Sequence, residues 1–246
     1  MTSLDGKRIW LTGGSLGIGR SLAHELGARG AIVVLTARNE EALETVRREV
    51  ESRGGKALVK SGDVTDLSRM QAIVAEIESE LAGIDVLIAN AGTHLPTHPE
   101  KFDTSEYLEL MDINYGGTLR CIEAVLPGML ARKKGRIVGI ASLAGLRGLP
   151  SAAAYSASKG AIINFLQSSR FHLQEHNIDI TIVNPGFVRT PLTDKNDFHM
   201  PFLIEPEKAA RIICNAIARD RKEVSFPIPF SWTIRLLRLL PHPIYN

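Results

Sequence analysis

Six short stretches of the sequence are mainly apolar along their length, and longer stretches with helical periodicity separate them. The apolar stretches are residues 8–11, 32–36, 57–60, 86–89, 137–141 and 180–183. Strands that are apolar on both faces fit a parallel sheet covered on both sides, whereas half-solvated strands alternate apolar and polar residues. The pattern therefore predicts an α/β, doubly wound fold with a central parallel sheet of about seven strands flanked by helices.

The pattern continues along the chain without a repeat, a low-complexity tract or a linker that would divide it. We therefore expect residues 1–246 to form a single domain. Residues 191–205 fit neither a helix nor a strand and are predicted to form a loop or lid. Residues 230–246 form an apolar C-terminal tail.

The charge and cysteine content exclude several classes of protein. The chain has 29 basic and 27 acidic residues, and no dense Lys/Arg block suggests a nucleic-acid partner. Cys121 and Cys214 lie in helix-patterned segments, with no spacing typical of a disulfide framework or a metal site. Residues 1–9 leave no space for the apolar core of a signal peptide. We therefore expect a cytoplasmic protein that binds no metal and no nucleic acid.

The first apolar stretch continues directly into a glycine-rich turn, Thr12 to Gly19, which a helix pattern follows. Glycines let the backbone turn tightly and approach a pyrophosphate, while a helix N-terminus offers free amides to anionic oxygens. The alternative is a glycine-rich turn without a ligand. In this strand-to-helix context the turn predicts a dinucleotide site. Its expected cofactor-binding residues are Gly13, Ser15, Leu16, Gly17, Ile18 and Gly19.

Three side chains further along the chain suit proton transfer to or from an oxygen atom. Ser142 follows the fifth apolar stretch, and Tyr155 and Lys159 share one face at the start of a predicted helix. A phenol with an ordinary pKa near 10 is a poor acid or base at neutral pH unless a nearby cation stabilises its anion. Taken singly, the pair could be a surface helix pair and the serine a helix cap.

The complete set of motifs, in this order, resembles the short-chain dehydrogenase/reductase family, whose single-domain members carry TGxxxGxG and YxxxK. The resemblance extends from Lys7 to about Val224. Three further family positions match, namely Asn90-Ala91-Gly92 after the fourth strand, Asn114 in the next helix, and Pro185-Gly186 with Thr190 after the sixth strand. Ala89 departs from the family, many of whose members have a second asparagine there, which affects a structural motif only.

The resemblance implies a Rossmann fold and an enzyme that transfers hydride between a nicotinamide and a carbonyl or alcohol. It implies that Tyr155 is the acid/base, Lys159 also holds the nicotinamide ribose, and Ser142 bonds the substrate oxygen. Asn114 would support a water-linked proton relay from Lys159. The remaining cofactor contacts that it implies are Asp63, Val64, Asn90, Ala91, Gly92, Tyr155, Lys159, Pro185, Gly186, Val188 and Thr190. Family members commonly form homodimers or homotetramers through the helices that begin near Thr104 and Tyr155.

The end of the second strand predicts which nicotinamide cofactor is used. An acidic residue there would bond the ribose hydroxyls of NAD and repel a phosphate. Ala37 stands at the corresponding position, and Arg38 follows it with a planar guanidinium that suits a phosphate. We therefore expect NADP(H). The alternative is that Arg38 stacks on adenine or simply faces solvent.

The substrate is predicted less sharply, from the apolar character of the lid. The lid contains Phe198, Met200, Pro201, Phe202 and Leu203, which would either cover an apolar substrate or pack against the protein. Isolated loop histidines such as His94 and His199 are usually solvated, although both positions suit the mouth of the site. We expect an apolar or lipid-like carbonyl or alcohol.

The tail has helical periodicity from Phe230 to Leu240. Arg235 and Arg238 share a narrow polar sector, and the rest of the helix surface is apolar, including Trp232. One interpretation is that the tail packs over the substrate pocket or across a subunit interface. The other is weak peripheral attachment to a membrane.

Two other functions are compatible with parts of the pattern. A sugar-nucleotide epimerase or dehydratase would have a different glycine spacing and a larger C-terminal region. A regulatory or scaffold module that senses NADP would not need the tyrosine and lysine. Because Tyr155 and Lys159 are both present, catalysis is the favoured prediction.

Overall fold

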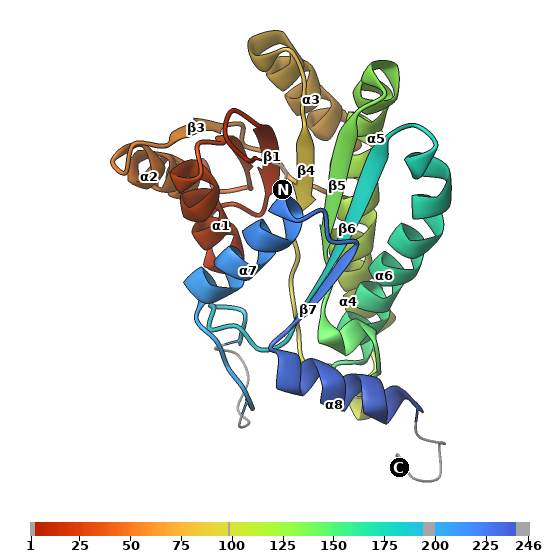
Figure 1. The fold of residues 1–246 in the computed structure, drawn as a ribbon. Helices are drawn as coiled ribbons and strands as arrows, with labels where there is room; N and C mark the ends of the chain where they lie inside the picture. Colours follow the sequence, from red (N-terminus) through yellow and green to blue (C-terminus); the bar gives the residue numbers. More distant parts are fainter. Residues whose placement is uncertain (1–2, 98, 194–199, 240–246) are drawn as a thin grey trace.

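The computed structural model describes all residues except 1–2, 98, 194–199 and 240–246, and gives no side-chain placement for residues 99, 238 and 239. Seven parallel strands form one sheet in the order β3-β2-β1-β4-β5-β6-β7 (Figure 1). They are β1 (Arg8–Thr12), β2 (Ile32–Thr36), β3 (Lys56–Val59), β4 (Val86–Ala89), β5 (Gly135–Ile140), β6 (Ile178–Pro185) and β7 (Glu223–Phe226). The predicted doubly wound parallel sheet is confirmed.

Helices cover both faces of the sheet (Figure 1). One face is covered by α1 (Gly17–Ala28), α2 (Glu40–Glu51) and α7 (Pro206–Ala218). The other is covered by α3 (Leu67–Leu81), α5 (Gly117–Arg132) and α6 (Ala153–Gln174), with α4 (Thr104–Met111) against α6. Each face has its own apolar core, one around Leu26 and Ile213 and the other around Trp10 and Val125. This two-sided burial explains why the strands are apolar on both faces.

Local sequence signals set several helix ends. The side chain of Asn39 accepts a hydrogen bond from the Ala42 amide at 2.9 Å and so caps α2, as its position before two glutamates predicts. Pro206 begins α7, where its fixed φ suits the first helical position. In both places the signal for the helix start is local and readable from a few residues.

The strand order places a crevice at one end of the sheet. Strand β1 pairs with β2 on one side and β4 on the other, so the chain reverses its direction of winding between β1 and β4. In open parallel sheets such a switch point leaves a gap between loops at the carboxyl ends of the strands, where ligands bind. The loops after β1, β4, β5 and β6 all meet at this end.

Two segments complete the same end of the molecule. The structure describes residues 191–193 and 200–205 of the predicted lid, and Ile204 in the second part forms a parallel bridge with Val188. Phe198 and His199 lie outside the described residues. Helix α8 (Ile228–Leu239) follows β7 and lies across the carboxyl end of the sheet (Figure 1).

Helix α8 has one buried and one exposed side. Ile234 is 2% exposed and Ser231 is also buried, whereas Trp232 is 69% exposed. Ile228 and Leu236, four residues before and after Trp232, are exposed as well. The apolar surface expected of the tail is therefore only half covered. In the described part of the chain, no helix is long and apolar enough to span a bilayer.

Candidate active site

A cavity of about 840 Å³ opens at the carboxyl ends of the strands. Ser142 lines it together with every residue predicted to bind the cofactor. These are Gly13, Ser15, Leu16, Gly17, Ile18, Gly19, Arg38, Asp63, Val64, Asn90, Ala91, Gly92, Tyr155, Lys159, Pro185, Gly186, Val188 and Thr190. Sequence motifs up to 177 residues apart, such as Gly13 and Thr190, therefore meet in one cavity.

The glycine-rich turn has the backbone geometry that its composition predicts. Gly13 and Gly17 have φ angles of +67° and +52°, which side chains rarely tolerate. A Cβ atom on Gly19 would lie 1.9 Å from the carbonyl oxygen of Gly13, so only glycine allows α1 to begin this close to the turn. Leu16 occupies the N-cap position without a side-chain hydrogen bond. The first amides of α1 therefore keep their capacity to bind an anion.

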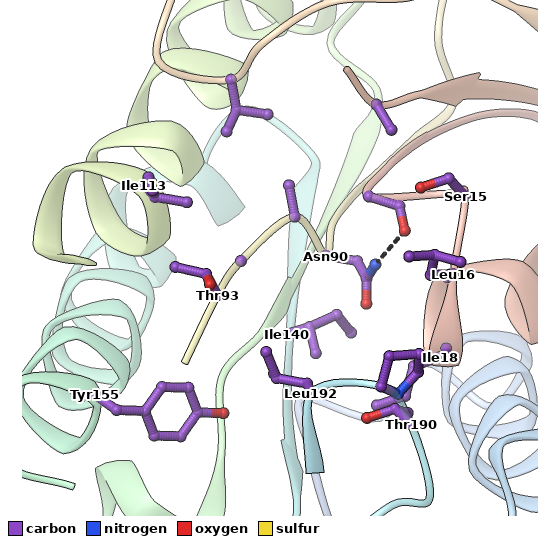
Figure 2. A pocket seen from close by; sticks show the side chains of 18 of the residues that line it. Ser15, Leu16, Ile18, Asn90, Thr93, Ile113, Ile140, Tyr155, Thr190 and Leu192 are labelled. Atoms are coloured by element: carbon purple, nitrogen blue, oxygen red, sulfur yellow. Dashed lines mark hydrogen bonds between the residues drawn. The ribbon is translucent and has the colours of Figure 1, made fainter. Parts of the chain in front are cut away.

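Asn90 holds this turn against the end of β4. Its side-chain amide donates hydrogen bonds to the carbonyl oxygens of Thr12 and Gly13, both at 3.0 Å, and Figure 2 shows it between the two loops. The Thr12 hydroxyl in turn accepts hydrogen bonds from the amides of Asn90 and Ala91. Asn90 therefore lines the cavity and fixes the shape of the glycine turn at the same time.

The rim near β2 and β3 carries Arg38 and Asp63. Arg38 is exposed, and among the described residues no carboxylate forms an ion pair with it. The Asp63 carboxylate accepts hydrogen bonds from the amide and hydroxyl of Thr65, both at 2.9 Å. The aspartate is thus held in place, while the guanidinium of Arg38 can take an anionic partner.

Tyr155 and Lys159 lie one turn apart on α6, as their spacing predicts, and Figure 2 shows the Tyr155 hydroxyl pointing into the cavity. Burial raises the pKa of Tyr155, and a hydrogen bond with Ser142 acts in the opposite direction. Lys159 is 5% exposed, and its Nζ donates a hydrogen bond to the Ile140 carbonyl oxygen at 2.9 Å. Burial lowers the pKa of Lys159 to about 8. At neutral pH the phenol is therefore protonated and the amine is mostly charged.

Ser142 also has a structural role. Its hydroxyl accepts a hydrogen bond from the amide of Ala144 at 3.1 Å and so caps the short turn η3 (Leu143–Gly145). A Cβ on Gly145 would lie 2.7 Å from the backbone carbon of Lys159, so this glycine lets η3 approach α6 closely. Sequence reasoning missed Gly145, and its only signal is a glycine three residues after Ser142.

Asn114 lies behind the cavity wall, in a π-helical turn (Asp112–Gly116) between α4 and α5. Its side chain accepts a hydrogen bond from the Thr93 amide at 2.7 Å and donates to the Thr93 carbonyl at 3.0 Å. The same amide group donates to the Ser158 hydroxyl at 3.0 Å, and that hydroxyl donates to the Tyr155 carbonyl at 2.8 Å. Asn114 thus connects the loop after β4 to the first turn of α6.

Apolar residues that sequence reasoning did not identify form other parts of the cavity wall. Leu95, Ile113, Ile140 and Leu192 line it, and Figure 2 shows Ile113, Ile140 and Leu192 around the space that Tyr155 faces. Single isoleucines and leucines carry no distinctive sequence signal of a cavity wall. In the part of the chain that the structure describes, no cluster of His, Cys, Asp and Glu could hold a metal ion.

A parallel sheet with a glycine turn at its switch point defines the class of dinucleotide-binding α/β proteins. Residues 7–200 match the family model described as short chain dehydrogenase. The chain therefore belongs to the short-chain dehydrogenase/reductase family of oxidoreductases, as the sequence resemblance predicts.

The chain resembles two curated oxidoreductases and one solved short-chain oxidoreductase over most of its length. It is 35% identical over 246 residues to an uncharacterized oxidoreductase of Myxococcus xanthus, with 100% of this chain and 97% of the relative covered. It is 34% identical to a fatty acyl-CoA reductase of Acinetobacter baylyi, with 91% and 77% covered. A metagenomic short-chain oxidoreductase solved in complex with NADP superposes with a TM-score of 0.79 at 31% identity, with 91% and 97% covered.

Proposed function

We propose that the protein is an NADP(H)-dependent oxidoreductase that reduces a carbonyl group or oxidises the corresponding alcohol, with Tyr155 as acid/base. The observation that carries the proposal is the Tyr155 hydroxyl, which points into the cavity and bonds Ser142, with Lys159 one helical turn away. Residues 1–246 would form one catalytic domain around this cavity. A cytoplasmic location is part of the same proposal.

The residues of the cavity suit a phosphorylated dinucleotide. A volume of about 840 Å³ falls within the range of small-molecule and cofactor sites. The α1 N-terminus offers amides without a side-chain cap to the pyrophosphate, and Arg38 offers a guanidinium to a ribose phosphate. Asp63 and Val64 would hold the adenine end, and Pro185, Gly186, Val188 and Thr190 the nicotinamide end. The metagenomic relative was solved with NADP, which supports the same cofactor here.

When bound, NADPH would supply the hydride, and side chains of the protein would donate the proton and position the substrate. Ser142 would donate a hydrogen bond to the substrate oxygen and position it next to Tyr155. The raised pKa of Tyr155 keeps the phenol protonated, which is the form that a proton donor needs. After transfer, the phenolate is stabilised by the ammonium of Lys159, whose Nζ lies 5.8 Å from the centre of the tyrosine ring.

Asn114 would act in this reaction as a positioning residue. Its side-chain amide is already hydrogen-bonded to Thr93 and Ser158. Its main-chain carbonyl oxygen accepts a hydrogen bond from the Thr118 hydroxyl at 2.8 Å. Because these bonds occupy the side-chain amide, we propose that a water relay from Lys159 would involve the main-chain carbonyl oxygen of Asn114. The proposed water relay therefore depends on this carbonyl rather than on the side chain.

The substrate is proposed to be apolar or lipid-like. Phe230 of α8 stacks on Phe187 with ring centres 5.5 Å apart, and a Cβ on Gly186 would lie 2.9 Å from the Phe230 ring. Helix α8 thus brings aromatic surface next to a residue that lines the cavity. The similarity to a fatty acyl-CoA reductase supports a substrate with an acyl chain. The exposed stripe Ile228, Trp232 and Leu236 would give weak peripheral contact with a membrane.

The protein is proposed to form a homodimer or homotetramer. Leu108 on α4 is 63% exposed and Phe171 on α6 is 75% exposed, and the two helices pack against each other. Large exposed apolar side chains on neighbouring helices are typical of contact surfaces. Their position on the helices through which family members commonly pair supports the same interface.

The proposed function is tested by turnover. Purified protein is incubated with NADPH or NADH and a series of ketones and aldehydes of increasing chain length, and cofactor absorbance is followed. We expect oxidation of NADPH that is faster with longer apolar carbonyls. Tight NADPH binding without turnover on any compound would instead support an NADP-sensing module.

A further inference from the structure

His94 lies between two residues that line the cavity, yet it packs against the catalytic tyrosine. Thr93 and Leu95 face the cavity. The ring of His94 contacts the ring of Tyr155 in a T-shaped arrangement, with centres 4.8 Å apart and planes at 72°. This is a favoured geometry for two aromatic rings, because the positive edge of one meets the negative face of the other.

The loop that carries His94 is fixed at both ends. At one end, the Asn114 side chain accepts a hydrogen bond from the Thr93 amide at 2.7 Å and donates one to the Thr93 carbonyl oxygen at 3.0 Å. At Thr97, the backbone amide donates to the carbonyl oxygen of Ser151, in the loop before α6, at 2.9 Å. His94 is therefore held at a defined distance from the first turn of α6, where Tyr155 lies.

The contact acts on the same ring whose hydroxyl forms a hydrogen bond with Ser142. A tyrosine ring turns about two side-chain bonds, and its hydroxyl sweeps over several ångströms when the ring tilts. Lys159 lies over the ring at 5.8 Å, and His94 supports it at an angle of 72°. Two contacts from different directions fix the plane of the ring and hence the position of the hydroxyl.

We propose that His94 is a positioning residue that holds the ring of Tyr155 so that its hydroxyl meets the substrate oxygen. The proposal rests on the proposed function, because it concerns the proton donor of that reaction. It requires the aromatic ring of His94 and not its ability to titrate. A phenylalanine at position 94 should therefore preserve the positioning role of the ring, whereas an alanine should abolish it.

The kinetic test compares His94→Ala and His94→Phe with wild type. Misplacement of a reacting group by a fraction of an ångström reduces turnover, so kcat of His94→Ala should fall by about tenfold. The Kd for NADPH and the melting temperature should stay close to wild type. His94→Phe should keep kcat within about twofold, because it keeps the edge-to-face contact. The matched control is His172→Ala, which removes an exposed histidine from α6, the helix that carries Tyr155.

A second measurement does not depend on turnover. The difference between the ultraviolet titration curves of wild type and Tyr155→Phe gives the ionisation of Tyr155. Burial raises the pKa of this tyrosine. Loss of the His94 ring admits water, so in His94→Ala this pKa should fall toward its ordinary value, and in His94→Phe it should not.

Three results would overturn the proposal: an unchanged kcat in His94→Ala, an equal loss of kcat in His94→Phe, or an unchanged Tyr155 titration in His94→Ala. Failure of the proposed function looks different. In that case wild type reduces no carbonyl, while the titration difference between His94→Ala and His94→Phe is still observed.

Discussion

The Nζ of Lys159 donates a hydrogen bond to the carbonyl oxygen of Ile140 at 2.9 Å, at the end of the strand that also leads to Ser142. The cation is therefore fixed by β5, while the phenol of Tyr155 is carried on α6. Burial lowers the pKa of this amine and raises that of Tyr155, so the two groups titrate in ranges that leave both protonated at neutral pH.

These pKa directions predict how reduction depends on pH. Lys159, with a pKa of about 8, loses its charge as pH rises through that value, whereas Tyr155 remains protonated. For carbonyl reduction, kcat/KM should be level at lower pH and fall above about pH 8. In Lys159→Arg the guanidinium stays charged, so the fall should move above about pH 10 at a lower absolute rate. A wild-type profile that stays level beyond about pH 9 would contradict the assignment.

Tyr155→Phe removes the proposed proton donor and keeps a ring of nearly the same size. Turnover should fall by about a hundredfold or more, the usual contribution of a positioned acid or base. NADPH binding, followed by fluorescence titration, should be unchanged. Tyr115→Phe is the matched control, because Tyr115 packs on Phe165 and does not line the cavity. Near wild-type rates in the Tyr155→Phe variant would show that another group supplies the proton.

Arg38→Asp should reverse the preference for NADPH over NADH. The change removes a cation that suits the ribose phosphate and adds a carboxylate that repels it and accepts ribose hydroxyls. The Kd for NADPH should rise by about tenfold to a hundredfold, the usual effect of a lost charge-assisted hydrogen bond, with a smaller gain for NADH. Arg53→Asp, which makes the same charge change outside the cavity, should alter neither. A wild type that binds both cofactors equally would refute NADP selection.

The parts of the fold that were predictable are those with local signals. Residues 86–89 were expected to be a strand and coincide with β4, because all four side chains are apolar. The cap at Asn39 and the start of α7 at Pro206 follow from chemistry within one turn. The sequence does not locate the strand β7 individually, because Glu223–Phe226 alternates polar and apolar residues over only four positions, too few to distinguish a strand from a loop.

The unpredicted features of the site depend on contacts between distant segments. The sequence indicates that Asn114 belongs to the site, but not that its amide is bonded to Thr93 and Ser158. Likewise, Asn90 was expected only as a cofactor contact, whereas it also bonds the carbonyl oxygens after β1. These pairings follow from the order of strands in the sheet, which motif spacing along the chain does not encode.

The proposed subunit interface is tested by placing a charge on its apolar side chains. Phe171→Asp combined with Leu108→Asp should convert the oligomer into monomers in analytical ultracentrifugation, because two carboxylates would be buried without partners. Trp232→Asp on α8 is the comparison, since it places the same charge on a different exposed apolar surface. If only Trp232→Asp dissociates the protein, α8 and not the α4/α6 surface forms the contact.

The role of the C-terminal helix is tested by changes on its exposed side. Deletion from Phe230 onward would also remove the Phe230–Phe187 stack and the buried Ile234, so it could not separate stability from function. Trp232→Ser and Leu236→Ser leave both contacts in place. If the stripe binds lipid, each variant should lower affinity for anionic liposomes by about tenfold, the usual effect of losing one large buried apolar side chain.

The loss of activity in the two exposed-side variants should depend on the chain length of the substrate. The two exposed-side variants should reduce turnover of long-chain carbonyls presented in liposomes and leave short soluble ketones unaffected, because short ketones do not need the membrane. Ile234→Ser, which places a hydroxyl in the packed side of α8, should instead lower the melting temperature and affect all substrates equally. Wild type that does not bind liposomes, together with equal effects of Trp232→Ser on short and long substrates, would exclude the membrane contact and leave α8 as a packing element beside Gly186.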